Sequence, residues 1–210
     1  MIVSAGRSLW RGISVFERFP GAFVIANIIA GVISLPIITA PIAWGGLSRL
    51  AHAAHQGPTC HLDDFWSGCR DYWLHGLLVG VLTAGLMFML YANYSTYVLQ
   101  SGALFVLLRA VWFTAAITWL STLLYLFPLL ERMEQPKLTI GLRNALTMTL
   151  KNPFFSLVVV IGVALLCVLS SLLIMPWALI TFALIASIAT AAVQNRLGAY
   201  TTKDIQGATA

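Results

Sequence analysis

The feature that most constrains this chain is a run of 44 residues, 152–195, that contains no Asp, Glu, Lys, Arg or His. A membrane-spanning helix needs about 20 apolar residues, and at 1.5 Å per residue this run is about 66 Å of helix. It is therefore long enough to cross a bilayer twice. We expect the bend between the two crossings at Met175-Pro176, because proline cannot donate a backbone hydrogen bond inside a helix.

Three further stretches also lack ionisable residues: 19–48, 76–108 and 110–130. Charged residues make up only 9% of the chain, whereas about 25% is usual for a soluble domain. So few charges leave too little polar surface to cover a globule in water. Backbone groups in lipid must be satisfied within their own segment, so helix is the expected state of each run. The sequence therefore predicts an all-α integral membrane protein.

The uncharged runs predict four full transmembrane helices, at residues 74–99, 103–126, 154–175 and 177–194. They belong to a single membrane domain over residues 21–199. Residues 1–20 combine basic and apolar side chains in a pattern that indicates an amphipathic helix on the membrane surface. Residues 200–210 are small and polar, and we expect a mobile tail there.

The region of residues 23–47 differs, because Pro36 and Pro41 divide it into two apolar halves. Each half has the length of a half-helix or re-entrant segment rather than of a full span. The region is then either a re-entrant hairpin, which enters and leaves on one side of the membrane, or a fifth span with a kink.

The distribution of Lys and Arg bears on this choice. Eleven of the twelve lie in the termini and connecting segments, and the exception is Arg109 within a predicted span. If residues 23–47 form a hairpin, all eleven fall on one side of the membrane; a single crossing would divide them eight to three. Positive residues mark the cytoplasmic side, so we favour the hairpin and expect the basic loops to be cytoplasmic.

Two stretches carry a family resemblance. They are NIIAGVISLPIITAPIA, residues 27–43, and LYLFPLLERMEQPKLTIGLRNALTMTLKNP, residues 124–153. Both are similar to landmarks of the YesL-like family of bacterial membrane proteins, and their order and spacing fit almost the whole chain. The sequence departs from the family pattern at Ala40, where a glycine is expected between Thr39 and Pro41.

This resemblance implies a limited function. YesL-like proteins are typically encoded beside importers and enzymes for plant-type oligosaccharides, and the family is suspected of assisting carbohydrate uptake. The resemblance thus implies a bacterial cell membrane as the location and importer subunits as partners. It carries over no catalytic or binding residue.

Potential metal ligands are concentrated in one stretch, HAAHQGPTCHLDDFWSGCR, residues 52–70. His52 and His55 share one face of a helix, and Cys60, His61 and Cys69 could complete a tetrahedral zinc shell. However, the gap between the two cysteines matches no compact zinc-binding spacing.

The alternative for this stretch is a boundary between two helices. Gly57 and Pro58 would end the first helix, and Thr59 or Asp63 would cap the next one. We favour this interpretation, because it accounts for more of the residues. We therefore expect no metal site and no cofactor.

Five residues are candidates for a polar path or binding site. Arg109 is the one charge within a predicted span, although it is close enough to the outer surface to extend to the headgroups. Thr114, Thr118 and Thr122 recur every four residues and either line a polar path or pack closely against another helix. Asn93 either hydrogen-bonds a sugar or belongs to an aromatic belt. We favour the structural alternative for each.

The stretch LTIGLRNALTMTLKN, residues 138–152, indicates an interfacial or partner-docking helix on the cytoplasmic side. Leu142 and Leu146 lie one turn apart on its apolar face, and Arg143 lies elsewhere on the helix. These three residues are the candidates for partner docking.

Several function classes lack the residues that they require. All seven acids lie outside the predicted spans: Glu17, Asp63, Asp64, Asp71, Glu131, Glu134 and Asp204. A proton-coupled carrier or an intramembrane aspartyl protease would need a carboxylate within the membrane. The chain also has no GxxxxGK[ST] phosphate loop to power transport. We therefore expect no enzyme and no catalytic residue.

The first function hypothesis is a non-catalytic membrane accessory that assists oligosaccharide uptake by an importer. The second is a small-solute facilitator or channel that uses the polar-path candidates, and the third is a metal-dependent enzyme or sensor built on residues 52–70. The expected partners are the lipid bilayer and importer subunits, with no nucleic acid.

Overall fold

The computed structural model describes the backbone of residues 2–173 and 177–208 and the side chains of residues 3–172 and 179–200. Within these ranges the chain consists of helices and short loops, without a strand. The elements are α1 (Ile2–Arg18), α2 (Pro20–Ile33), η1 (Ile37–Thr39), α3 (Ala40–Gln56), α4 (Leu62–Asp71), α5 (Trp73–Val98), α6 (Ala103–Leu130), α7 (Leu138–Lys151), α8 (Pro153–Leu173), η2 (Trp177–Thr181) and α9 (Phe182–Ala208).

Four helices of the described ranges are long and apolar enough to cross a membrane: Trp73–Val98, Ala103–Leu130, Pro153–Leu172 and Leu179–Tyr200. They correspond to the four predicted spans and confirm an all-α, multi-pass membrane protein. The predicted bend at Met175-Pro176 lies outside the described residues. The helix of α9 runs beyond the predicted start of the tail as far as Ala208, and the mobility of that tail stays a prediction.

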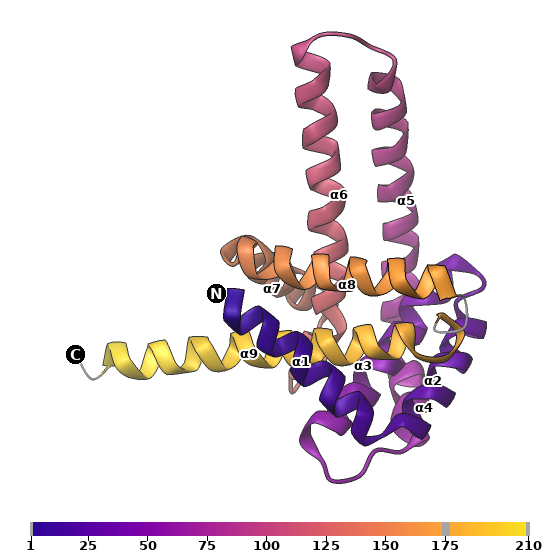
Figure 1. The fold of residues 1–210 in the computed structure, drawn as a ribbon, viewed down its shortest axis with the longest axis vertical. Helices are drawn as coiled ribbons and strands as arrows, with labels where there is room; N and C mark the ends of the chain where they lie inside the picture. Colours follow the sequence, from indigo (N-terminus) through magenta and orange to yellow (C-terminus); the bar gives the residue numbers. More distant parts are fainter. Residues whose placement is uncertain (1, 174–176, 209–210) are drawn as a thin grey trace.

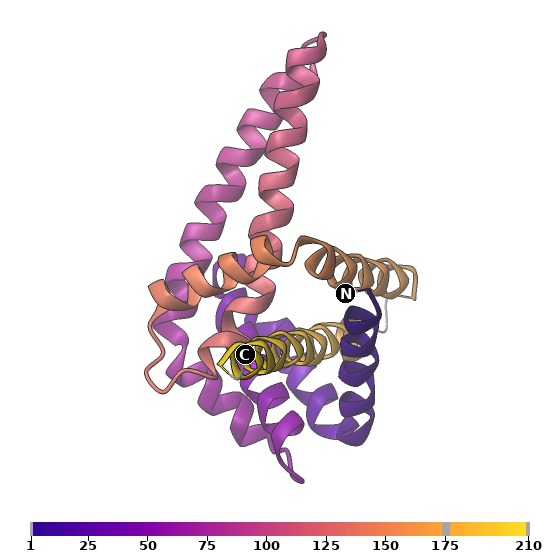
Figure 2. The same cartoon turned by 90° about the vertical axis from the view of Figure 1, so that its left-hand side faces the viewer.

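The helices α5 and α6 form an antiparallel hairpin that projects from the rest of the molecule (Figures 1 and 2). The other helices gather around the base of this hairpin, and α8 and α9 run across its direction (Figure 1). With 26 and 28 residues, α5 and α6 are about 40 Å long, which exceeds the roughly 30 Å of a bilayer's hydrocarbon core. The hairpin is therefore long enough to cross a membrane by itself.

The first apolar segment is broken at Pro36, as predicted. The helix α2 ends at Ile33, the 3-10 turn η1 follows Pro36, and α3 begins at Ala40. Pro41, in contrast, does not break the chain. It lies in the first turn of α3, where proline is tolerated because its missing N–H would have no partner within the helix. Ala40 has helical backbone angles (φ −52°, ψ −40°), so this position does not require glycine.

The two arms of this segment pack against each other. The helix α2 has 14 residues, about 21 Å, which is too short to cross a bilayer, and it packs along α3. Another bend precedes this segment, where the chain turns by 100° between α1 and α2. The described part of the chain thus contains four candidate spans, or five if α1 and α2 together form one. The choice between a re-entrant hairpin and a fifth span stays a prediction.

Glycines let the helices at the base of the hairpin approach closely. A Cβ atom on Gly46 of α3 would lie 2.8 Å from the carbonyl oxygen of Phe65 in α4. A Cβ atom on Gly12 of α1 would lie 2.7 Å from the Cα of Ile188 in α9. Any larger residue would push these helix pairs apart.

The helix α1 is formed as predicted, and one of its faces is covered by protein. Ala5, Ser8 and Val15 are buried where α1 packs on α8 and α9, whereas Trp10 is exposed. The amphipathic pattern of α1 therefore serves a helix–helix contact, and its location at a membrane surface stays a prediction.

Candidate functional site: an apolar cavity and a buried ion-pair cluster

A cavity of about 550 Å³ lies between the base of the α5–α6 hairpin and the broken first segment. Buried side chains form its inner wall, among them Leu47 of α3, Val79 of α5 and Phe127 of α6. Its mouth is framed by Ile37 of η1, which is 81% exposed, and by Leu120 of α6, which is 54% exposed. The cavity is thus closed on the inside and open at an apolar rim.

A stripe of small residues on α5 shapes this cavity. Gly76, Gly80 and Ala84 recur every four residues on one face of α5. A Cβ atom on Gly76 would lie 2.8 Å from the Cα of Ile42, and one on Gly80 would overlap the carbonyl oxygen of Ile38. The two glycines therefore let η1 and the start of α3 lie directly on α5, and Ala84 lines the cavity one turn further along. This small-xxx-small pattern is a sequence signal that could have located the contact.

The cavity wall has little capacity for hydrogen bonding. Apart from Ser34, Trp44 and Thr83, its lining side chains are apolar or absent. The indole N–H of Trp44 and the hydroxyl of Thr83 are themselves buried and have no partner among the described residues. A sugar would lose the water around its many hydroxyl groups here and find only these few polar groups in exchange, which is unfavourable. The cavity suits an apolar ligand.

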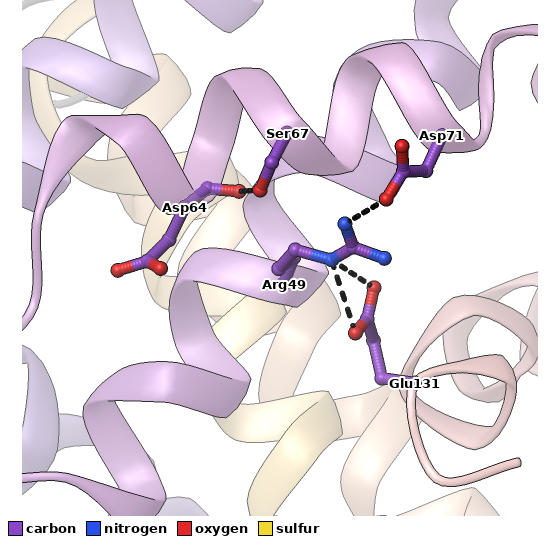
Figure 3. Close-up of polar contacts among 5 residues, drawn as sticks. All are labelled: Arg49, Asp64, Ser67, Asp71 and Glu131. Atoms are coloured by element: carbon purple, nitrogen blue, oxygen red, sulfur yellow. Dashed lines mark hydrogen bonds and ion pairs between the residues drawn. The ribbon is translucent and has the colours of Figure 1, made fainter. Parts of the chain in front are cut away.

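Arg49 of α3 forms an ion-pair cluster with carboxylates of two other helices (Figure 3). Its Nε donates to both carboxylate oxygens of Glu131, at 3.0 and 3.2 Å, and its Nη1 donates to Asp71. The side chain of Glu131, the residue that caps α6, is 7% exposed, that of Arg49 is 23% exposed, and that of Asp71, at the end of α4, is 56% exposed. The cluster therefore ties α3, α4 and α6 together at the base of the hairpin.

Tyr72 links this cluster to the cavity. The guanidinium carbon of Arg49 lies 5.1 Å from the centroid of the Tyr72 ring. That ring meets Phe127 edge-on, with 5.7 Å between the ring centroids, and Phe127 lines the cavity. One layer of aromatic rings thus separates the charges from the apolar cavity.

The pKa shifts of the cluster indicate that it has a structural role. Burial raises the pKa of the Glu131 carboxyl above its usual value, although the charge of Arg49 opposes the shift. Burial would lower the pKa of Arg49, but its hydrogen bond to Asp71 and the charge of Glu131 outweigh burial and raise it. Arg49 therefore stays charged and paired, which suits holding helices together rather than transferring a proton.

Another arginine, Arg196, connects α9 to α1 and to the start of α8. Its Nη2 donates to the hydroxyl of Ser4 at 2.6 Å, and its Nη1 donates to Oδ1 of Asn152 at 3.4 Å. Its guanidinium carbon lies 3.7 Å from the ring centroid of Phe155. Arg196 follows the last predicted span, yet it is 7% exposed within α9 rather than in a loop.

The five polar-path candidates do not line the cavity. Each donates to a backbone carbonyl oxygen, with the bonds Asn93 to Met89, Thr114 to Ala110, Thr118 to Thr114 and Thr122 to Thr118, and with Arg109 bonded to both Phe105 and Val98. Hydroxyl and amide donors used within their own helix are not offered to a passing solute. The choice between a polar path and the structural alternative stays a prediction for the five residues.

The residues of the stretch 52–70 face different neighbours. The Nε2 atom of His55 lies 3.1 Å from the carbonyl oxygen of Ser187 in α9, and Cys60 Sγ lies 3.7 Å from the carbonyl oxygen of Leu50. Burial lowers the pKa of His55 to about 4 and raises the pKa of Cys60 to about 11. Among the described residues, no group of three His, Cys, Asp or Glu side chains gathers where it could hold a metal ion.

The predicted helix boundary lies in this stretch, with one correction. Gly57 ends α3 in an extended conformation. The N-cap of α4 is His61, so the predicted caps Thr59 and Asp63 are wrong. The reason is that Asp64, in the first turn of α4, reaches back and accepts the backbone N–H of His61 at 3.1 Å.

The three docking candidates of α7 differ in their exposure. Leu142 packs against the core formed with α6, whereas Leu146 is 41% exposed and Arg143 is also exposed. A Cβ atom on Gly141 would lie 2.6 Å from Cδ2 of Leu130, so α7 lies directly on α6. Leu142 is therefore partly covered within the chain itself, and docking through these three residues stays a prediction.

Comparison with known proteins identifies no relative. No protein-family model matches this chain, and no curated protein or solved structure is significantly similar to it.

Proposed function

We propose that this protein is a non-catalytic accessory in a bacterial cell membrane, similar to the YesL-like family, that assists oligosaccharide uptake by an importer. The observation that carries the proposal is the projecting α5–α6 hairpin. Its large apolar side chains, such as Phe88, Leu107 and Phe113, are exposed along its length. Such a hairpin can lie in the membrane against the transmembrane helices of another protein.

The orientation that we propose places the basic loops in the cytoplasm. The turn at residues 99–102 then lies outside the cell, and the ion-pair cluster and α7 lie on the cytoplasmic side. Leu146 and Arg143 of α7 are exposed there, so they extend the proposed partner surface from the hairpin to the cytoplasmic face.

The alternative of a small-solute facilitator has less support. A polar solute needs groups that replace its water of hydration along its path. The cavity is apolar, and the hydroxyls of Thr114 and Thr118 donate within α6. These features agree better with an accessory whose effect depends on a partner.

Photocrosslinking in cells grown on an oligosaccharide tests the proposal. A benzoylphenylalanine residue replaces Phe88 or Phe113 on the hairpin, and in the control it replaces Trp10 of α1, which is also apolar and exposed. We expect a covalent adduct with a membrane subunit of an importer from the two hairpin positions and not from the control. Oligosaccharide flux through the purified protein alone in liposomes would contradict the proposal and support the facilitator.

A further inference from the structure

We propose that the cavity at the base of the α5–α6 hairpin holds one acyl chain of a membrane phospholipid. The chain would enter sideways from the bilayer, between η1 and the hairpin. This inference does not depend on the proposed importer partner, because it concerns a site formed within this chain alone.

The position of the mouth supports entry from the bilayer. Its rim consists of Ile37, Ala84 and Leu120, all apolar and all exposed. Ala84 and Leu120 belong to two of the candidate membrane spans. A side chain in the middle of a membrane-spanning helix faces hydrocarbon unless protein covers it. The mouth of the cavity therefore opens towards lipid chains.

The size and chemistry of the cavity select its occupant. Its volume of about 550 Å³ lies within the range of roughly 300–1,000 Å³ that is typical of ligand sites. Protein interiors are close-packed, so a space of this size is unfavourable when empty. Water is a poor occupant of most of this space, since each molecule needs roughly two to four polar partners and the wall offers only Ser34, Trp44 and Thr83. A hydrocarbon chain fills the space without needing any partner.

The floor of the cavity restricts recognition to the chain of the lipid. Val79, Leu124 and Phe127 are buried and apolar, and Phe127 and Tyr72 stand between the cavity and Arg49. A headgroup phosphate inside the cavity would therefore not reach the guanidinium of Arg49. We expect the site to bind phosphatidylglycerol and phosphatidylethanolamine equally well.

A photoactivatable phospholipid tests this site. The purified protein is reconstituted in vesicles of phosphatidylethanolamine and phosphatidylglycerol that contain a trace of either lipid with a diazirine at the end of one acyl chain. After illumination, the labelled residues are located by peptide mass spectrometry. We expect label on Val79, Leu124 and Phe127, to the same extent with both headgroups.

Two tryptophan substitutions provide the matched comparison. Ala84→Trp places a bulky ring in the mouth, whereas Ala115→Trp places it on an exposed position of α6 outside the cavity. Both variants should fold, as checked by an unchanged thermal unfolding midpoint. We expect Ala84→Trp to reduce labelling of the floor residues about tenfold and Ala115→Trp to leave it unchanged.

Three labelling patterns would overturn the proposal. They are label confined to outward residues such as Phe88, floor label that Ala84→Trp does not reduce, and strong dependence on the headgroup. Displacement of the label by free fatty acid but not by unlabelled phospholipid would also overturn it, in favour of a fatty-acid site. The importer is absent from this experiment, so its outcome is independent of the crosslinking test of the proposed function.

Discussion

Arg49 and Glu131, which are 82 residues apart in the chain, meet with the Nε of one 3.0 Å from the Oε1 of the other. This pair fixes α3 to the end of α6 at the base of the projecting hairpin. Breaking a buried ion pair from one side leaves the other charge without compensation, and such changes typically cost about 3–5 kcal/mol.

We therefore expect Glu131→Ala to lower the free energy of unfolding by roughly 3 kcal/mol, measured by denaturant unfolding in detergent micelles. Asp71→Asn is the matched control, because Asp71 is more than half exposed and its loss should cost about 1 kcal/mol or less. Replacing both partners, in Arg49→Met with Glu131→Leu, should restore much of the stability. A double variant that is less stable than Glu131→Ala would show that the ion pair is not what the single change disrupts.

The pKa of His55 makes stability depend on pH. Burial lowers this pKa to about 4 in the folded protein, while an unfolded histidine titrates near 6.5. Between these values the unfolded chain binds more protons, so the stability present above pH ~6.5 is lost as pH falls towards 4. We expect the free energy of unfolding of His55→Gln to fall by about 3 kcal/mol less than that of the wild type over this pH range. Thermal unfolding from pH 7.5 to 4 measures it, and equal slopes in both proteins would contradict the assignment.

The contact between α5 and η1 depends on the absence of a side chain at residue 80. Gly80→Ala would drive a methyl group into the carbonyl of Ile38, so we expect a loss of about 1–3 kcal/mol. Gly85→Ala, on the same helix, meets nothing within 4 Å and should change stability by less than about 1 kcal/mol. Thermal unfolding of both variants measures these changes. Equal changes in stability would mean that the close approach of η1 to Gly80 does not stabilise this contact.

Two exposed positions on opposite sides test the orientation. In a background without the three native cysteines, we expect Gln100→Cys to react with a membrane-impermeant maleimide added to intact cells. Lys137→Cys should react only after the membrane is opened, because positive loops stay in the cytoplasm. The reverse pattern would invert the proposed topology.

Two substitutions on α7 distinguish an effect on stability from an effect on partner binding. Leu146 is exposed, whereas Leu142 packs inward. We expect Leu146→Glu to leave thermal unfolding unchanged and to reduce co-purification with an importer, since it charges only an exposed contact. Leu142→Glu should instead destabilise the protein by several kcal/mol, because it buries an unpaired carboxylate. If Leu146→Glu co-purifies with the importer as well as the wild type does, α7 is not part of the proposed partner surface.

The sequence by itself determined the class of the protein and the position of most helices. Long uncharged runs such as residues 152–195 leave helix in a membrane as their only stable state, because hydropathy and backbone hydrogen bonding are satisfied within each segment. The break at Pro36 was also predictable, since proline acts on the backbone next to it. These are local properties, and a single segment is sufficient to reveal them.

Tertiary structure alone decided the site. The partners of Arg49 come from the end of α4 and from the cap of α6, and the cavity is lined by residues from Ala30 to Phe182. The same holds for α7. Its sequence shows an apolar face, but only the structure shows that Leu142 on this face packs against α6. Periodicity shows that a helix has an apolar face, but what covers that face depends on contacts between segments far apart in the chain, which no local pattern encodes.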